Sequence, residues 1–384
     1  MLSGSPKMLM LATTAAMIEQ FNKDNILILE NMGYEIHVAG NWNAGNPISS
    51  ERLAEFKAWL QEHHGKWFQI SATRKPTDFI NNIKAYEEVV SLINRYNYKF
   101  IHCHTPIGSI IGRIAAQKTK TKIIYTAHGF HFFKGAPLKN WLMYFPVEWI
   151  CSWITDVLIT INKEDYERAK RFLHAKKTKY IPGVGVNIEK FATCNVDKKE
   201  KCRLLEIPDD KFILLSVGEL QKRKNHKIVI DALGKIKNTD IYYIIAGQGA
   251  LKKHYEKMIK SYGLEQNVKL LGYRTDIDEL CQIADCFVHT AFHEGLSVAL
   301  LEAMASGLPI IASNVRGVKD LVKQDQGGIC INPTSVNEMS AATQKLFTNK
   351  DFREKCGFYN SITVKKYSID NVSQLMKTIY KTQI

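Results

Sequence analysis

Short runs of apolar, often β-branched residues alternate with longer stretches of helical periodicity along the whole sequence. Strands that alternate with helices pair in parallel, because each helix crosses over the sheet before the next strand begins. We therefore expect an α/β protein with two doubly wound parallel sheets of similar size. The strand candidates are Lys7–Ala12, Glu35–Ala39, Trp67–Ile70, Phe100–His104, Lys122–Ala127, Asp156–Ile161 and Lys179–Ile181, then Phe212–Val217, Tyr242–Ala246, Lys269–Leu271, Cys286–His289, Pro309–Ala312 and Gly328–Ile331.

The boundary between the two units is expected near Ile181–Cys194, where Pro and Gly interrupt the pattern and a polar run follows. A chain of 384 residues is long enough for two or three domains. We place one Rossmann-like domain at 1–187 and a second at 188–366, and expect a last helix, about 367–384, to cross back onto the first. Ligands of such sheets bind beyond the carboxyl ends of the strands, so a cleft is expected where the two domains face each other.

The chain is basic, with 52 Lys and Arg against 38 Asp and Glu and a formal charge of +14. Such a balance favours an anionic partner: a nucleic acid, a membrane surface or a phosphorylated small molecule. The charge is unevenly placed, because Val89–Val147 contains no acidic residue. Its basic residues are Arg95, Lys99, Arg113, Lys118, Lys120, Lys122, Lys134 and Lys139.

The cysteines and histidines do not favour a metal site. The eight cysteines form no Cys-x-x-Cys pair and several lie in apolar runs, which indicates buried free thiols in a reducing compartment. In His102-Cys103-His104, strand alternation places the two histidines on one face and the cysteine on the other, which argues against shared metal ligation.

Neither apolar stretch of the chain is typical of a membrane-crossing segment. Met8–Met17 is better interpreted as a first strand than as a signal sequence, since a helical pattern continues after it without a cleavage context. Trp141–Ile161 is interrupted by Pro146, Glu148 and Asp156. We expect a cytoplasmic protein, peripheral on the inner face of the cell membrane.

The strongest local motif is Phe292–Pro309, in which a strand ends near Thr290, a Gly-containing loop follows and a helix begins near Leu296–Ser297. Free N–H groups at such a helix start attract an anion, and the helix dipole adds to the attraction. The simpler interpretation makes Glu294 a helix cap and Glu302 a solvated carboxylate. Two glutamates eight residues apart around a strand–loop–helix junction argue for a binding site instead.

The Glu-x7-Glu spacing within HEGLSVALLEAMASGLPIIAS resembles the signature of the retaining family-four glycosyltransferases, which have the GT-B architecture of two Rossmann-like domains. The resemblance extends over most of the chain. Further segments that resemble the family are Tyr125–Gly129, Ile181–Asn187 with Phe191, Ser216–Leu220 continuing to Lys224–His226, and Gly247-Gln248-Gly249.

The resemblance implies a role for each matching residue. Glu294 would hydrogen-bond the donor sugar, Glu302 would bind the ribose hydroxyls, and Lys224 would pair with the diphosphate of the leaving nucleotide. His128 would lie near the anomeric centre, from the opposite domain. The residues implied as catalytic are Glu294, His128 and Lys224, and those implied as donor-binding are Glu302, Gly295, Leu296, Ser297, Gly218 and Gly247.

The sequence departs from the family pattern at two places. Many members have Arg where this chain has Glu219, and a carboxylate cannot pair with a diphosphate. Lys224 then acts with Lys222 or Arg223, or backbone donors supply the remaining contacts. The family's Gly-Gly near the first strand is also missing, since Ala12–Ala15 stands there.

Structural interpretations of the same residues stay open. Lys224 fits a surface charge, His128 fits a histidine satisfied within the fold, and Gly247-Gln248-Gly249 fits a tight strand-to-helix turn.

Gly129–Trp153 is rich in aromatic residues and contains two lysines, a composition typical of a surface that meets anionic lipid headgroups. The alternative places these aromatics in a core beneath a loop, and a helix with two faces allows both. The aromatics are Phe130, Phe132, Phe133, Trp141, Tyr144, Phe145, Trp149 and Trp153. Nucleic acid is not expected as a partner, because no zinc, homeodomain or RNP-like pattern is present.

The function implied by the resemblance is retaining transfer of a sugar from a nucleoside diphosphate donor, UDP-sugar, to a lipid-linked or polysaccharide acceptor in capsular or exopolysaccharide synthesis. No cofactor and no metal are expected, since Lys and a helix N-terminus take the place of the metal. Two alternatives remain: a nucleotide-sugar epimerase of the same architecture, and a non-catalytic, membrane-associated nucleotide-binding module.

Overall fold

The structure is a computed structural model that describes residues 4–382 and divides the chain into two units. The first unit is Met1–Val184 with Asp370–Ile384, and the second is Gly185–Ile369. The chain thus passes from the first unit to the second within the Pro- and Gly-interrupted segment 181–194. It returns to the first unit at the start of the last helix.

The first unit is built on a seven-stranded sheet with the order β3-β2-β1-β4-β5-β6-β7, in which all neighbouring strands are parallel. Seven of the eight residues of its interior strand β1 are buried, as expected for a strand that has helices on both sides. The strands are β1 (Lys7–Thr14), β2 (Glu35–Asn41), β3 (Lys66–Gln69), β4 (Phe100–His104), β5 (Lys122–Ala127), β6 (Val157–Thr160) and β7 (Lys177–Tyr180).

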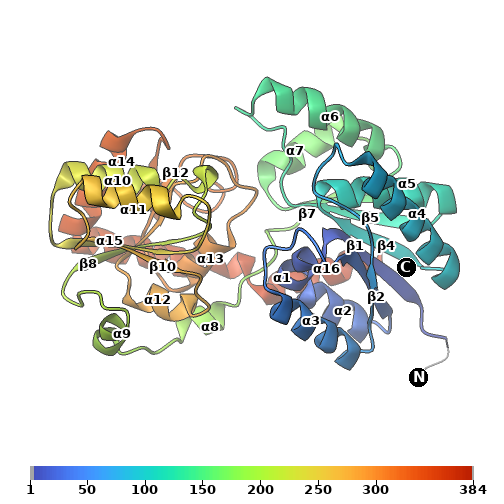
Figure 1. Ribbon diagram of the computed structural model, residues 1–384, viewed down its shortest axis with the longest axis horizontal. Coiled ribbons are helices and arrows are strands. Elements are labelled where there is room, and N and C mark those ends of the chain that lie inside the picture. The colour runs from blue at the N-terminus through green and yellow to red at the C-terminus, as the bar shows by residue number, and fades with distance from the viewer. Residues whose placement is uncertain (1–3, 383–384) are drawn as a thin grey trace. The chain divides into compact units, whose positions relative to one another are not determined.

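Helices cover both faces of this sheet (Figure 1). One face packs against apolar side chains of α4, α5 and α7, and the aromatic residues of α6 add to this core. The other face is covered by α1, α2 and α16. The helices are α1 (Ala15–Phe21), α2 (Lys23–Asn31), α3 (Ser50–Glu62), α4 (Phe79–Tyr96), α5 (Pro106–Thr119), α6 (Leu138–Ser152), α7 (Lys163–Phe172) and α16 (Ile369–Lys381).

The last helix, α16, packs on the first unit although the chain reaches it from the second. Its apolar residues repeat at helical spacing, and Val372, Met376 and Tyr380 are buried. The Tyr380 ring lies 5.9 Å from the Phe100 ring, and its hydroxyl is 2.8 Å from Nδ1 of His102 on β4. An apolar stripe and one buried hydroxyl thus fix α16 against the sheet.

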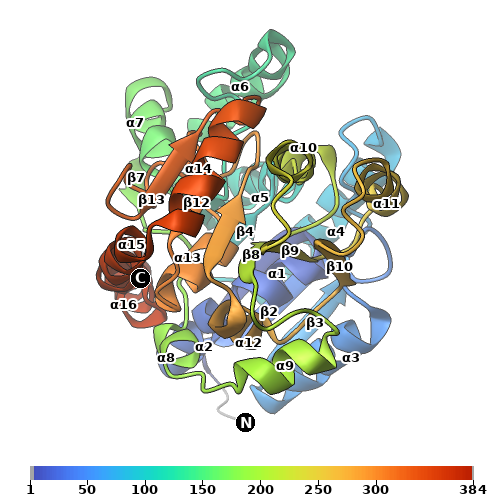
Figure 2. The same ribbon diagram turned by 90° about the vertical axis from the view of Figure 1, so that its left-hand side faces the viewer.

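The second unit has a six-stranded parallel sheet with the order β10-β9-β8-β11-β12-β13, seen with its helices in Figure 2. One face packs on α10, α11 and α14, and the other on α8, α12 and α13. The strands are β8 (Phe212–Val217), β9 (Ile241–Ala246), β10 (Val268–Gly272), β11 (Cys286–His289), β12 (Ile310–Ser313) and β13 (Gly328–Ile331).

Two helices of this unit, α8 and α9, precede its first strand, and the others lie between its strands or follow the last one. The helices are α8 (Ile188–Ala192), α9 (Lys198–Leu204), the 3₁₀ turn η1 (Lys222–Lys224), α10 (Lys227–Ile236), α11 (Lys252–Ser261), α12 (Ile277–Ile283), α13 (Val298–Ala305), α14 (Val336–Thr348), α15 (Lys350–Thr363) and the 3₁₀ turn η2 (Val364–Tyr367).

The expected α/β class with two parallel sheets is confirmed, and each of the thirteen strand candidates overlaps an observed strand. The prediction succeeds because strands buried on both faces stand out as continuous apolar runs. Among residues 4–382, no helix is both long enough and apolar enough to cross a membrane.

Candidate active site

A charged cluster lies beyond the carboxyl ends of β8 and β11, where the η1 turn meets the loop that leads to α13. The two segments are joined through their backbones, because Phe292 N–H donates to the Arg223 carbonyl at 2.9 Å. Asn225 has a left-handed backbone and donates its amide to the carbonyls of Thr290 and Pro333, at 3.2 and 2.8 Å. Asn225 thereby fixes the turn that aims Arg223 and Lys224 at the loop.

Glu294 is the centre of this cluster and is only 9% exposed. Its Oε1 accepts from Nζ of Lys224 at 2.6 Å and from Nη1 of Arg223 at 2.7 Å, and Nε2 of His289 lies 3.5 Å away. One carboxylate thus faces two permanent cations, so the cluster has an excess of positive charge.

The electrostatics follow from this geometry. Burial alone would raise the pKa of Glu294, but His289, Lys224 and Arg223 outweigh it and hold that pKa well below its ordinary value. Burial lowers the pKa of His289. At neutral pH the cluster therefore holds an ionised Glu294, two cations and a neutral histidine.

The start of α13 places Gly295, Leu296 and Ser297 directly after Glu294. Ser297 is the N-cap, since its side chain accepts from the Leu300 N–H at 3.4 Å. Leu296 is half-buried against the core of the unit. The side chain of Ser297 is therefore used within the fold, and its backbone is what remains for an anion.

Glu302 lies on the same helix, α13, and is only partly exposed. Burial raises its pKa to about 7, with a further increase from Asp278 and an opposing effect from Lys190. None of the residues from 4 to 382 donates a hydrogen bond to its carboxylate, so this group differs sharply from the ion-paired Glu294.

The two glycines expected to bind a donor pack against each other. A Cβ on Gly247 would lie 1.9 Å from the Gly218 carbonyl oxygen, so only glycine fits there. Gly218 in turn lies along the side chain of Lys224, whose Cε would be 3.2 Å from a Cβ at this position. These contacts give the Gly-x-Gly segment a packing role, and its contact with a donor stays a prediction.

His128 lies in the first unit, just beyond the end of β5. Its Nε2 is 3.1 Å from Nδ1 of His104, the last residue of β4. Burial lowers the pKa of His128 to about 4. The two rings line a small cavity of about 20 Å³ together with residues of α2 and α16.

Residue types alone indicated only part of this arrangement. Within the second unit the structure brings together Glu294, Lys224 and Gly218, with Gly247 behind them. It adds His289, which the sequence marked only as the last residue of a strand, and selects Arg223 rather than Lys222 as the second cation. In the described part of the chain, no group of three or more His, Cys, Asp or Glu side chains is placed to hold a metal ion.

His102 and His104 share one face of β4, as strand alternation predicted, with ring centroids 4.2 Å apart. Cys103 belongs to the core on the opposite face.

The aromatic stretch after β5 divides between core and surface. Phe130 and Phe132 are buried, and Trp141, Tyr144 and Phe145 pack partly against the core. The exposed side of α6 is mainly aliphatic, and we call it the α6 apolar face. Its members are Leu138, Leu142, Met143, Val147, Trp149 and Ile150, followed by Trp153.

Arg113, one of the basic residues of the acid-free run Val89–Val147, is not on the surface. It is 1% exposed, and its guanidinium donates to Glu148 at 2.9 and 3.2 Å and stacks 4.4 Å from the Tyr125 ring. The sequence counts Arg113 within an acid-free run, but Glu148 follows that run by a single residue. Folding brings them together, because α5 and α6 are neighbours on one face.

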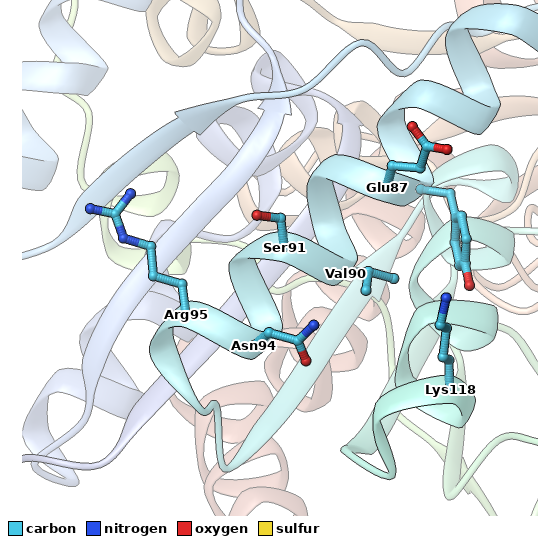
Figure 3. Close-up of a pocket in the computed structure, with 7 residues that line it drawn as sticks. Glu87, Val90, Ser91, Asn94, Arg95 and Lys118 are labelled. Atoms are coloured by element: carbon cyan, nitrogen blue, oxygen red, sulfur yellow. The ribbon is translucent and has the colours of Figure 1, made fainter.

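An open groove of about 570 Å³ on α4 and α5 does not resemble an anion site (Figure 3). Its cations diverge, since Arg95 points away while Lys118 reaches toward the Tyr86 ring, 5.9 Å from its centroid. Both residues stand near helix ends that precede the next strand, opposite the carboxyl edge of the sheet. We therefore do not count this groove as part of the site.

Two family models match the chain. One, described as glycosyl transferases group 1, matches residues 197–361, and the other, described as glycosyl transferase 4-like, matches residues 8–162.

Named relatives extend over most of the chain. A protein of Bacillus subtilis (strain 168) that carries the name glycosyltransferase EpsD is 34% identical over 97% of this chain and 96% of its own. The UDP-Gal:alpha-D-GlcNAc-diphosphoundecaprenol alpha-1,3-galactosyltransferase of Escherichia coli is 30% identical over 71% of this chain and 72% of its own.

Among solved structures, HepE from Anabaena, crystallised in complex with UDP and glucose, has a TM-score of 0.79 to this chain. The superposition covers 98% of this chain and 100% of that one at 18% identity. This likeness concerns the fold.

Proposed function

This chain belongs to the glycosyl transferases group 1 family and has the GT-B fold, and we propose that it moves a sugar from a UDP-sugar to a lipid-linked saccharide during cell-surface polysaccharide synthesis. The observation that supports this proposal most directly is the pairing of Glu294 with Arg223 and Lys224 beside the start of α13.

The diphosphate of the donor binds to the cationic side of this cluster. Arg223 and Lys224 exceed the single charge of Glu294. The N–H groups of Gly295–Ser297 follow Glu294 along the chain at the start of α13 and add to the attraction for an anion. When the diphosphate enters, the cations turn from Glu294 toward its oxygens, and Glu294 is released to accept from the sugar hydroxyls. One carboxylate thus holds the cations in place before the donor arrives.

Glu302 receives the ribose. Two neighbouring hydroxyls suit a carboxylate that can accept two hydrogen bonds, and no residue of the described chain competes for this one. The helix α13 then carries both recognition groups, with the sugar near its start and the ribose farther along it.

The reaction follows a same-face course without a protein nucleophile. The acceptor hydroxyl attacks the anomeric carbon as the bond from that carbon to the phosphate oxygen breaks, and the hydroxyl proton passes to the departing phosphate. Lys224 and Arg223 stabilise the charge that develops on the diphosphate, so positive side chains and a helix start perform the work of a metal ion. His128 contributes a hydrogen bond at the sugar from the first unit.

The first unit and the named relatives support a lipid-linked acceptor. The Escherichia coli relative is named for a donor that is UDP-Gal and an acceptor that is linked to diphosphoundecaprenol. A lipid-linked acceptor stays in a membrane, so its transferase must work at that surface.

The α6 apolar face suits such a surface. Leu142 and Ile150 are exposed by 69% and 60%. The exposed Lys139 lies in the first turn of α6, and the exposed Lys134 lies in the segment just before the helix. Apolar side chains insert at the headgroup level, and each lysine near an anionic leaflet adds about 1 kcal/mol. We propose that the protein is cytoplasmic and rests on the membrane through α6.

Donor choice is tested by thermal shift and by product analysis. A panel of UDP-, GDP- and TDP-sugars is screened for stabilisation of the full chain, and the best donor is incubated with and without a short diphospholipid saccharide. We expect UDP-sugars to stabilise the protein, and transfer with retained anomeric configuration in magnesium-free buffer with EDTA. Conversion of one UDP-sugar into another without acceptor would overturn transfer in favour of epimerisation.

Membrane docking is tested separately by flotation with vesicles that contain anionic lipid. Leu142→Asp with Ile150→Asp should abolish salt-sensitive binding, whereas Phe358→Asp, which changes an equally exposed residue of α15 in the second unit, should not. Equal binding of the two variants would remove the α6 part of the proposal and leave the donor site untouched.

A further inference from the structure

Two histidines of the first unit, His102 and His104, differ in their hydrogen-bond partners. His102 has both ring nitrogens occupied, Nδ1 by the Tyr380 hydroxyl and Nε2 by the Thr126 hydroxyl, each at 2.8 Å. His104 is equally buried, at 1% exposure, but only its Nδ1 has a partner, which is Nε2 of His128 at 3.1 Å. His102 is thus satisfied within the fold, and His104 is not.

The hydrogen bond between the two rings has only one proton to share. Burial holds the pKa of His104 well below its ordinary value and lowers that of His128 to about 4, so both rings are neutral at pH 7. Each neutral ring has one N–H and one lone pair. Either His104 donates from Nδ1, or His128 donates from Nε2.

The other nitrogen of His104 decides between these two arrangements. Its Nε2 is buried, and no residue in the range 4–382 lies within hydrogen-bonding distance of it. If His128 donated, the remaining proton of His104 would sit on this nitrogen as a buried donor without a partner. Such donors are rarer and more costly than unpaired acceptors, so the proton of His104 belongs on Nδ1.

We propose that His104 is a positioning residue for His128: it donates from Nδ1 to Nε2 of His128 and thereby keeps the proton of His128 on Nδ1. The inference rests on the proposed function, in which His128 contributes a hydrogen bond at the donor sugar. With Nε2 occupied as an acceptor, Nδ1–H is the group that His128 can offer. Without this hydrogen bond, the proton of His128 would be distributed over both ring nitrogens, and only part of the molecules would have the Nδ1–H form that can donate to the sugar.

The fold supports this arrangement from both sides. His104 and His128 stand at the carboxyl ends of the neighbouring parallel strands β4 and β5, where His104 is paired in register with Thr126. The ring of Phe21 lies 6.4 Å from that of His128, and the His102 ring packs against the His104 ring, tilted by 44° with 4.2 Å between centroids. Packing thus restricts the orientation of the His104 ring, which determines the nitrogen of His128 that carries the proton.

The first test reads the tautomer directly and needs no substrate. The full chain is labelled with ¹⁵N-histidine, and the imidazole shifts of His128, assigned with His128→Ala, are compared among variants. We expect Nδ1–H in the wild type, a mixture in His104→Phe, and Nδ1–H again in His104→Asn, whose amide can donate from the position of Nδ1. Thr126→Val, which removes a partner of His102 only, should leave the tautomer unchanged. An Nε2–H form of His128 in the wild type would overturn the proposal.

The second test asks whether His104 acts through His128. UDP release from UDP-galactose, UDP-glucose and UDP-N-acetylglucosamine is measured for the single variants and for the pair. His104→Phe should lower kcat about tenfold with little change in KM, and His104→Asn should restore most of it. Adding His104→Phe to His128→Ala should cause no further decrease in kcat. Additive losses would overturn the positioning role, whereas full activity of His128→Ala with an altered tautomer in His104→Phe would refute only the function proposed for His128.

Discussion

Replacing Glu294 by Gln should destabilise the ligand-free protein and at the same time strengthen its binding of UDP. Glu294 accepts charge-assisted hydrogen bonds from Lys224 at 2.6 Å and Arg223 at 2.7 Å. A hydrogen bond that involves a charged pair contributes roughly 1 kcal/mol more than one to a neutral amide. Losing two such bonds should lower the free energy of unfolding by about 2 kcal/mol. This loss is small for a buried ion pair because the Arg223 side chain is one-third exposed.

The gain in UDP affinity has the same origin. In the wild type the diphosphate must draw both cations away from a carboxylate, whereas in Glu294→Gln they face a neutral oxygen. We expect UDP to bind about tenfold more tightly, which is about 1.4 kcal/mol. Transfer should nevertheless fall, because Gln cannot provide the carboxylate that accepts from the donor sugar.

Denaturant unfolding and calorimetric titration with UDP measure both effects. For a unit of this size, 2 kcal/mol corresponds to a decrease in Tm of about 4–8 °C. The control is Glu206→Gln, which breaks an exposed ion pair with Lys269 at 2.9 Å and should change stability by less than about 0.5 kcal/mol. Unchanged Tm in Glu294→Gln, or weaker UDP binding together with normal folding, would refute this account of the cluster.

Three further perturbations test other parts of the molecule. Burial raises the pKa of Glu302 to about 7, so lowering the pH from 8 to 6 should protonate it and weaken UDP binding about tenfold. In titrations Glu302→Gln should remove most of this pH dependence, and the remainder comes from the terminal phosphate of UDP itself. Equal pH dependence of Kd in the wild type and in Glu302→Gln would contradict the ribose role. Glu148→Ala leaves Arg113 buried without its partner and should lower the free energy of unfolding by about 3–5 kcal/mol. Glu148→Leu combined with Arg113→Met should recover much of that loss. Equal stability of the two variants would show that the unpaired charge of Arg113 is not what destabilises the protein. Gly247→Ala puts a Cβ 1.9 Å from the Gly218 carbonyl oxygen and should destabilise the second unit by about 1–3 kcal/mol and weaken UDP binding. Thermal unfolding with and without UDP measures both effects. Wild-type stability and UDP binding would mean that the two loops move apart freely.

Strand positions were predictable from the sequence because burial on both faces leaves a local pattern, but the partners of charged groups were not. Arg113 and Glu148 are 35 residues apart, and Lys224 and Glu294 are 70 apart. A charge count assigns Arg113 to the surface, and only the packing of α5 beside α6 shows that it is neutralised. Likewise, the aromatic residues after β5 have no periodicity that separates the buried Phe132 from the exposed Trp149.

The site itself shows the same division between local and distant information. Spacing in the sequence marked Glu294 and Glu302, since both belong to one strand–loop–helix junction. The contribution of His104 depends on two strands lying side by side, and strand alternation alone established only that His102 and His104 share a face. Sequence patterns thus identify groups that lie on one element, whereas hydrogen bonds between elements require the fold.

The residue Glu219 shows how the structure resolves a departure from the family pattern. An acidic residue at this position removes the expected cation, yet the Glu219 side chain is exposed and pairs with the amide of its neighbour Gln221. The second cation comes instead from Arg223 on the η1 turn, which reaches Glu294 next to Lys224. That turn is fixed by Asn225 through the carbonyls of Thr290 and Pro333, so the position of Arg223 depends on a left-handed asparagine rather than on the strand end that holds Glu219. The positive charge beside the start of α13 is therefore kept, although it is supplied from the other end of the turn.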